Sequence, residues 1–141
     1  MKSKYRQSIL NLRNALSSSE VSSLSKEIVK NVNAEFSLDE VGILGSYFSV
    51  NNEVDLTAIN KKRFNENRLT TYPKIGPNYS MNLIAPITFE QLIKNKYDIY
   101  EPSDGDAINS MEHEIIIIPT VGVDTVSYTH LQAHETDRHL V

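Results

Sequence analysis

The sequence predicts one α/β domain of three layers, in which helices flank a mostly parallel sheet that is incomplete at its C-terminal side. Amphipathic segments alternate along the chain with short, continuous apolar runs such as "VGILGSYFS" and "EIIIIP". Such runs are typical of strands that are buried on both faces. A length of 141 residues suits a single core. Ligands of such sheets bind at loops beyond the carboxyl ends of the strands.

Two helices are predicted at the start of the chain. The first is indicated by apolar residues at three- and four-residue steps, namely Tyr5, Ile9, Leu12 and Leu16. "SSSE", from Ser17 to Glu20, has the spacing of a capping box and predicts where the second helix begins. Its apolar stripe then consists of Val21, Leu24, Ile28 and Val32.

The rest of the chain predicts four strands and two more helices. Residues 41–49 form a buried strand, and a helix follows the polar turn "NNEVD". "RLTTYP" is expected to be a strand that stops at Pro73, and "MNLIAPI" another. Thr88 and Gln91 have capping-box spacing and predict a helix over "FEQLIKNK". "EIIIIP", residues 114–119, is the clearest strand.

Composition narrows the classes of function. The formal charge of −4 argues against nucleic acid or an anionic membrane as a general partner. The chain has no cysteine, so disulfides, thiol nucleophiles and cysteine-based zinc sites are excluded. No secretory signal or membrane span is recognisable, which makes a cytoplasmic protein the expectation.

Basic residues gather on the first predicted helix. Lys2 and Arg6 are four residues apart and therefore share a helix face, and Lys4 and Arg13 add positive charge nearby. This face could hold phosphate, since arginine offers a bidentate fork and lysine a point charge. It could equally be the solvated side of an amphipathic helix.

Two acids follow the first strand, which ends in Tyr47 and Phe48. Glu53 could hold the amino groups of a flat heterocycle. Asp55 fits the N-cap of the next helix instead. Lys74, in "PKIGPN", is expected in a plain turn, and His113 is expected at the surface.

Three histidines lie in the tail. His130 and His134 are four apart with Glu135 beside them, and His139 follows. This spacing resembles helical zinc sites. The alternative is that the tail is not native sequence.

Five segments, in order, resemble the 5-formyltetrahydrofolate cyclo-ligase (methenyltetrahydrofolate synthetase) family. "KSKYRQSILNLRNALS" looks like its opening Lys-x-x-x-Arg helix, and "SYFSVNNEVDL" like its strand followed by a substrate-binding glutamate. "TYPKI", "YDIYEPSDGD" and "EIIIIPTVGVD" complete the match, which ends near Asp124.

The resemblance implies ATP- and magnesium-dependent ring closure of 5-formyltetrahydrofolate. The formyl oxygen would attack the γ-phosphate, the N10 nitrogen would attack the activated carbon, and phosphate would leave to give 5,10-methenyltetrahydrofolate. The ATP-binding segment would be Lys2, Ser3, Lys4, Tyr5 and Arg6. Phe48 and Glu53 would bind the folate.

The chain departs from the family after Asp124. Family members continue with a glycine-rich basic loop that binds ATP and magnesium, whereas "TVSYTHLQAHETDRHLV" contains no glycine. Residues 126–136 match a translation of the transposon end used in sequencing libraries at every position but Gln132. We therefore expect a domain over residues 1–124 and a translated adapter over residues 125–141, which leaves no zinc site.

The expected consequence is that this chain is inactive, because the missing loop would supply half of the ATP site. No metal ligand or catalytic residue is assigned within it. The native protein is expected to be a monomer that acts on a small folate. Two alternatives remain, a non-catalytic relative that binds nucleotide or folate, and an unrelated α/β enzyme that acts on a phosphorylated small molecule.

Overall fold

The computed structural model describes residues 2–121 and 139–140. Helix α1 spans Lys2–Asn14, α2 spans Ser18–Phe36 and α3 spans Thr57–Asn65. Ser17 accepts a hydrogen bond from the backbone N–H of Glu20, and the Glu20 carboxylate accepts one from the backbone N–H of Ser17. The predicted capping box is therefore confirmed, as is a helix beginning directly after it.

Strand β1 lies between α2 and α3 in the chain, the other strands follow α3, and one sheet in the described ranges has the order β6-β3-β2-β1-β7-β8. Strand β1 pairs in parallel with β2 and β7, and β7 pairs in parallel with β8, while β3 pairs antiparallel with β2 and β6. A second sheet joins β4 to β5. The strands are β1 Leu44–Gly45, β2 Thr70–Ile75, β3 Met81–Pro86, β4 Leu92–Lys94, β5 Tyr100–Pro102, β6 Gly105–Ala107, β7 Ile115–Ile116 and β8 His139–Leu140. The α/β class and the mostly parallel pairing around β1 are confirmed.

Two local predictions are wrong. Strand β2 continues through Pro73 to Ile75, because pairing with β1 ends at Thr71 while pairing with β3 goes on beyond the proline. The missing N–H of Pro73 therefore costs nothing in the parallel ladder. The helix expected after Thr88 is one 3₁₀ turn, Phe89–Gln91, followed by β4. Thr88 does cap that turn, since its hydroxyl accepts from the N–H of Glu90.

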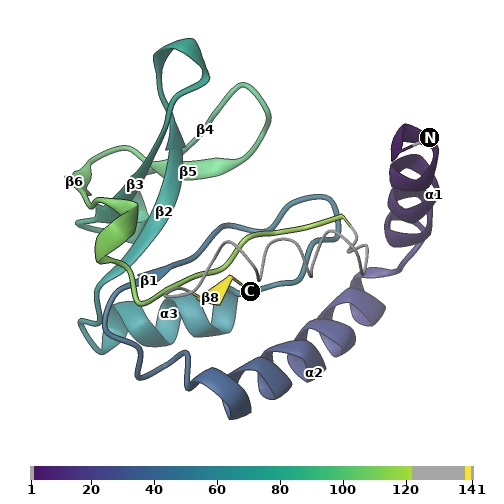
Figure 1. Cartoon of the computed structure of the whole chain (residues 1–141), viewed down its shortest axis with the longest axis horizontal. Coiled ribbons are helices and arrows are strands. Elements are labelled where there is room, and N and C mark those ends of the chain that lie inside the picture. Colours follow the sequence, from purple (N-terminus) through teal and green to yellow (C-terminus); the bar gives the residue numbers. More distant parts are fainter. Residues whose placement is uncertain (1, 122–138, 141) are drawn as a thin grey trace.

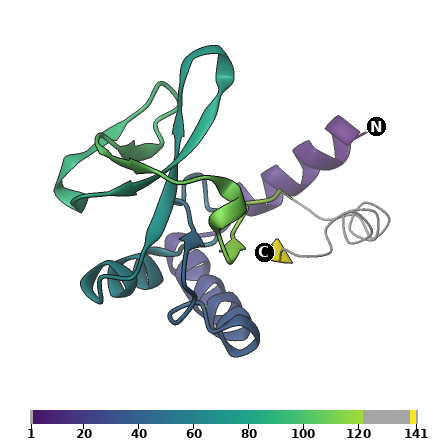
Figure 2. The ribbon, with the colours of Figure 1, turned by 60° about the vertical axis from the view of Figure 1, so that its left-hand side comes forward.

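Two further 3₁₀ turns, Pro77–Tyr79 and Ser110–Glu112, connect strands. Figures 1 and 2 show α2 and α3 on the same side of β1, while β2 and β3 extend away on the other side. The core lies between these helices and the central strands. Its buried apolar side chains are Leu38, Val41, Leu44, Tyr47, Leu56, Ile59, Ile115 and Ile117.

Arg63 of α3 is the most deeply buried charged side chain in the described residues, with no solvent exposure. Burial lowers the pKa of its guanidinium. The guanidinium donates to oxygens that lie before β1 or at the start of β2, at distances of 2.7–3.2 Å: Leu38 O, Val41 O, Gly42 O, Leu69 O and the Thr70 hydroxyl. Carbonyl and hydroxyl oxygens therefore balance the buried charge of Arg63 in place of a carboxylate. The same bonds connect α3 to the starts of both strands.

His113 is buried, not at the surface as predicted, with 5% of its area exposed. Its Nδ1 lies 3.0 Å from Asn109 O and its Nε2 lies 2.7 Å from the hydroxyl of Thr71. Because a carbonyl can only accept, Nδ1 carries the proton, and Nε2 accepts from Thr71. Space for the ring comes from Gly45, where a Cβ would lie 3.3 Å from the imidazole.

Within the described residues, the helices are too short or too polar to cross a bilayer.

Candidate functional site

Helix α1 carries the predicted ATP-binding segment on its outer half. Lys2, Ser3, Lys4, Tyr5 and Arg6 are all exposed, and α1 buries no residue. The stripe that was expected to pack is also open, since Tyr5 is 69% and Leu12 72% exposed. Figures 1 and 2 both show α1 standing away from the rest of the fold, with only its C-terminal end close to it. The cations of α1 are therefore accessible to an anionic ligand.

The Glu53 loop is a tight turn after β1. Asn51 and Asn52 both have left-handed backbone angles, with φ of 51° and 61°. The N–H of Glu53 donates to Val50 O, and the carboxylate Oε1 of Glu53 accepts from the N–H of Val50 at 2.9 Å. In the described part of the chain, Oε2 has no hydrogen-bond partner. One carboxylate oxygen shapes the loop, and the other is available to a ligand.

Asn52 connects this loop to the end of α1. Its Nδ2 donates to Arg13 O at 2.8 Å and to Leu16 O at 3.0 Å. Arg13 O is one of the final carbonyls of α1, which lack a regular helical partner, and Leu16 O belongs to the linker that follows. The Glu53 loop and the base of α1 are thus held together by one side chain.

Two further bonds fix the loop from the other side. The hydroxyl of Tyr47 donates to Val54 O at 2.8 Å, and the hydroxyl of Ser25, on α2, accepts from the N–H of Asp55. Burial raises the pKa of the Tyr47 phenol, and the charges of Glu53 and Asp55 raise it further. Tyr47 therefore stays protonated and remains a donor. Asp55 caps α3 in the predicted manner, since its carboxylate accepts from both the N–H and the hydroxyl of Thr57.

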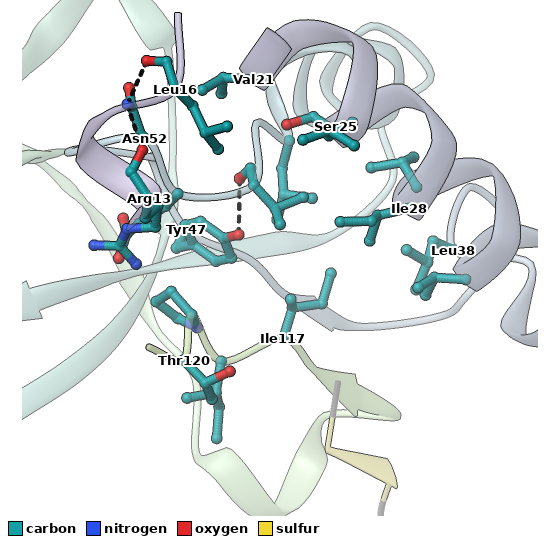
Figure 3. Close-up of a pocket in the computed structure, with 18 residues that line it drawn as sticks. Arg13, Leu16, Val21, Ser25, Ile28, Leu38, Tyr47, Asn52, Ile117 and Thr120 are labelled. Atoms are coloured by element: carbon teal, nitrogen blue, oxygen red, sulfur yellow. Dashed lines mark hydrogen bonds between the residues drawn. The ribbon is translucent and has the colours of Figure 1, made fainter. Parts of the chain in front are cut away.

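A pocket of about 310 Å³ lies between α2, the Glu53 loop and the chain that follows β7 (Figure 3). Most of its wall is apolar, and Arg13, Asn52 and Glu53 supply polar groups. The Nε of Arg13 is buried and has no hydrogen-bond partner in the described residues. Apolar walls with a few polar groups are what a flat ligand with polar edges requires.

Phe48 lies elsewhere. Its ring stacks on Tyr72 with centroids 4.3 Å apart, and Phe89 meets it edge to face at 6.1 Å. Phe64 stacks on Phe89 at 4.4 Å and completes an aromatic cluster. Tyr72 is buried, its pKa is raised by that burial, and its hydroxyl has no partner within the described ranges.

The predicted site residues are therefore only partly brought together. Glu53 adjoins the base of α1, but Arg6 is seven residues further out, about 10 Å along the helix, and Lys2 about 16 Å. Phe48 belongs to the aromatic cluster and lines none of the pockets that contain Glu53. Lys74 lies in β2, not in a turn, and its Nζ donates to Ser103 O.

Asn52 and the pocket role of Tyr47 were missed by the sequence reasoning. The signal for Asn52 was the pair Asn51–Asn52, because asparagine is enriched at left-handed positions. The sequence pattern did not indicate that the Asn52 side chain would reach the C-terminal end of α1.

The described residues contain no group of three or more histidine, cysteine or acidic side chains placed to hold a metal ion together. Of the tail histidines, His139 lies in β8, and His130 and His134 fall outside the described residues.

Comparison with known proteins gives the fold a context. The chain is similar to the 5,10-methenyltetrahydrofolate synthetase of Aquifex aeolicus, with 23% identity and a TM-score of 0.76, over 99% of this chain and 76% of that one. It is also similar to the 5,10-methenyltetrahydrofolate synthetase of Mycoplasma pneumoniae, with 20% identity and a TM-score of 0.63, over 86% of this chain and 65% of that one. The chain thus spans from about two thirds to three quarters of their lengths. No curated protein matches the sequence.

Comparison with models of protein families identifies the family of this chain, which similarity of fold alone does not. The family model described as the 5-formyltetrahydrofolate cyclo-ligase family matches residues 1–127, which include α1, the Glu53 loop and β7. The predicted resemblance is confirmed, and the chain belongs to the 5-formyltetrahydrofolate cyclo-ligase family.

Proposed function

We propose that the native protein converts 5-formyltetrahydrofolate to 5,10-methenyltetrahydrofolate with hydrolysis of ATP. The proposal rests mainly on the position of the Glu53 carboxylate. It borders a largely apolar pocket, and its Oε2 has no hydrogen-bond partner in the described residues. A carboxylate accepts hydrogen bonds from the ring N–H and amino groups of a pterin, and apolar walls cover the ring faces.

The ATP part of the proposal is supported by α1. Lys2 and Arg6 are exposed on one helix, where they can meet phosphate oxygens without breaking an existing ion pair in the described ranges. Charge neutralisation of this kind is the main contribution that a protein makes to phosphoryl transfer. Magnesium would arrive with the nucleotide, and we assign it no ligand among these residues. Phe48 is proposed to contact folate through the exposed part of its ring.

Residues 125–141 are proposed to be a translated adapter, which would leave the 141-residue chain without the glycine-rich loop. The native protein is proposed to be a cytoplasmic monomer. Sequencing the genomic DNA beyond the Asp124 codon tests the origin of the tail directly.

Activity is tested by following methenyltetrahydrofolate absorbance with ATP and 5-formyltetrahydrofolate. We expect turnover by the protein that carries its native continuation, and little or none by the 141-residue chain. Turnover by the 141-residue chain would overturn the expectation that it is inactive without the glycine-rich loop. Binding without turnover in the continued protein would favour a non-catalytic relative of the family, and tight binding of sugar phosphates without folate would favour an unrelated activity.

A further inference from the structure

The connection between α1 and the rest of the fold is narrow. Helix α1 buries no residue, and its apolar stripe is open to solvent. The backbone that leaves it towards α2 is short, with α1 ending at Asn14 and α2 beginning at Ser18. The orientation of α1 therefore depends on what holds its last turn.

Asn52 holds that turn from far away in the sequence. Its amide bridges Arg13 O and Leu16 O, which are 39 and 36 residues earlier in the chain (Figure 3). Arg13 O also accepts from the N–H of Leu16 at 3.2 Å, so Asn52 reinforces a single 3₁₀-type closure at the helix end.

Asparagine is well suited to this position for two reasons. An amide has two N–H donors, and both of its targets are carbonyl oxygens; a carboxylate of the same shape would repel them. Asparagine also tolerates the left-handed backbone that Asn52 adopts, with φ of 61°. Asn51 has almost the same backbone angle but is exposed, and the structure shows no side-chain hydrogen bond for it among the described residues.

Asn52 is also the direct chain neighbour of Glu53. The Val50–Glu53 turn closes through two bonds, Glu53 N–H to Val50 O and Val50 N–H to Glu53 Oε1, and Asn52 lies inside this turn. A ligand bound to the unpaired Oε2 of Glu53 acts on the same carboxylate whose Oε1 closes this turn. Any resulting change in the turn reaches Arg13 and Leu16 through the Asn52 amide.

From this geometry we propose that Asn52 is a positioning residue that couples the Glu53 loop to α1, so that folate bound at Glu53 orders the helix that carries the nucleotide-binding cations. The inference rests on the proposed function for the roles of Glu53 and α1. It adds a physical link between the two, because a ligand at one site changes the equilibrium at the other only through a differential contact.

The test measures exchange of the two amides that close the C-terminal end of α1, Ala15 N–H to Asn11 O and Leu16 N–H to Arg13 O, in the 141-residue chain with and without 5-formyltetrahydrofolate. Folate binding itself is followed separately by calorimetry. In the unchanged chain we expect folate to slow exchange of the Ala15 and Leu16 amides by roughly fivefold or more, a typical size for coupling between sites. In Asn52→Gly this folate effect is lost, although glycine accepts the same backbone angle.

Asn51→Gly is the matched control. It makes the same chemical change at the adjacent left-handed position without touching α1, so it should retain the folate effect. Asn52→Asp is a second variant that keeps the size of the side chain while replacing donors with an acceptor, and it should lose the effect as Asn52→Gly does.

The outcomes distinguish folate binding at Glu53 from coupling through Asn52. If the unchanged chain binds no folate, the folate-binding role proposed for Glu53 fails and the inference fails with it. If folate binds but α1 exchange does not respond, or if both Asn52 variants still transmit the response, the inference alone is wrong. Because α1 contributes nothing to the core, both Asn52 variants should remain folded by circular dichroism, and unfolding of both would also contradict a purely positioning role.

Discussion

Arg63 and the cations of α1 are basic residues on helices with opposite surroundings. Arg63 is fully buried, and its guanidinium donates to five oxygens of the protein itself. Lys2 and Arg6 are exposed, and none of the hydrogen bonds or ion pairs in the described residues involves their side chains. A cation whose donors are all used holds the fold, whereas cations with unused donors are available to a ligand. The comparison predicts that the two groups fail in different ways when they are replaced.

The largest effect is expected for Arg63→Lys. An ammonium has at most three donors for the five oxygens, so at least two of these bonds are lost. Each acceptor left unpaired costs about 1–3 kcal/mol, and among the described residues only Leu69 O of the five also accepts from a backbone N–H, that of Leu44. We expect the free energy of unfolding, measured with urea, to fall by about 3 kcal/mol. Arg68→Lys is the control, because Arg68 is exposed and makes only long contacts, 3.4 Å to Glu40 O and 3.5 Å to the Glu66 carboxylate. An equal loss in both variants would show that Arg63 is not special.

The next effect concerns binding rather than stability. Replacement of Lys2 or Arg6 by alanine should weaken ATP binding about tenfold in the protein with its native continuation, because each loses a charge-assisted bond to phosphate. The unfolding midpoint should stay where it is. Lys30→Ala, which removes an exposed cation from α2, should change neither quantity. Unchanged ATP affinity in both α1 variants would contradict the phosphate-binding role proposed for Lys2 and Arg6.

Smaller changes in stability are expected when neutral donors, the hydroxyls of Tyr47 and Tyr72, are removed. Tyr47→Phe removes a bonded hydroxyl and should destabilise the protein by about 1 kcal/mol. Tyr72→Phe removes a buried hydroxyl with no partner in the described residues, so it should leave stability unchanged or raise it by about 1 kcal/mol. Thermal unfolding of the two variants side by side gives the sign. Losses of equal size would mean that the Tyr72 hydroxyl has a partner after all.

The smallest effect appears only at alkaline pH. Burial raises the pKa of both Tyr47 and Tyr72 above the ordinary value of 10.0. Above pH 10.0 the unfolded chain loses phenolic protons that the folded protein retains, so stability present below that pH is lost as the pH rises. Urea midpoints measured on either side of pH 10.0 should show this decline. It should be shallower in Tyr72→Phe, and an identical slope would argue against the raised pKa of Tyr72.

The helices could be predicted from sequence where the signal is local. Ser17 and Glu20 define the start of α2 because their two reciprocal bonds span only three residues. The same pattern failed at Thr88, where the hydroxyl does cap a turn but the chain then pairs as β4 with β5. Here the pairing of β4 with a strand that begins six residues after it overrides the capping signal at Thr88.

The site was predictable to a lesser degree. Glu53 and the basic helix could be named from their motifs, but the link between them depends on Asn52, whose partners lie 36 and 39 residues away. His113 was misjudged for a related reason. Its burial requires the empty space above Gly45 and the Thr71 hydroxyl, and neither is adjacent to it in the sequence.

Among the described residues, α1 is held at its C-terminal end, so a change of angle there moves its N-terminal end furthest. Lys2 lies about 16 Å from Arg13 along the axis, so a tilt of roughly 10° at the base moves its Cα by about 3 Å. That displacement is comparable to the length of a hydrogen bond. Small adjustments around Asn52 are therefore enough to decide whether the outermost cation of the helix can reach a phosphate group.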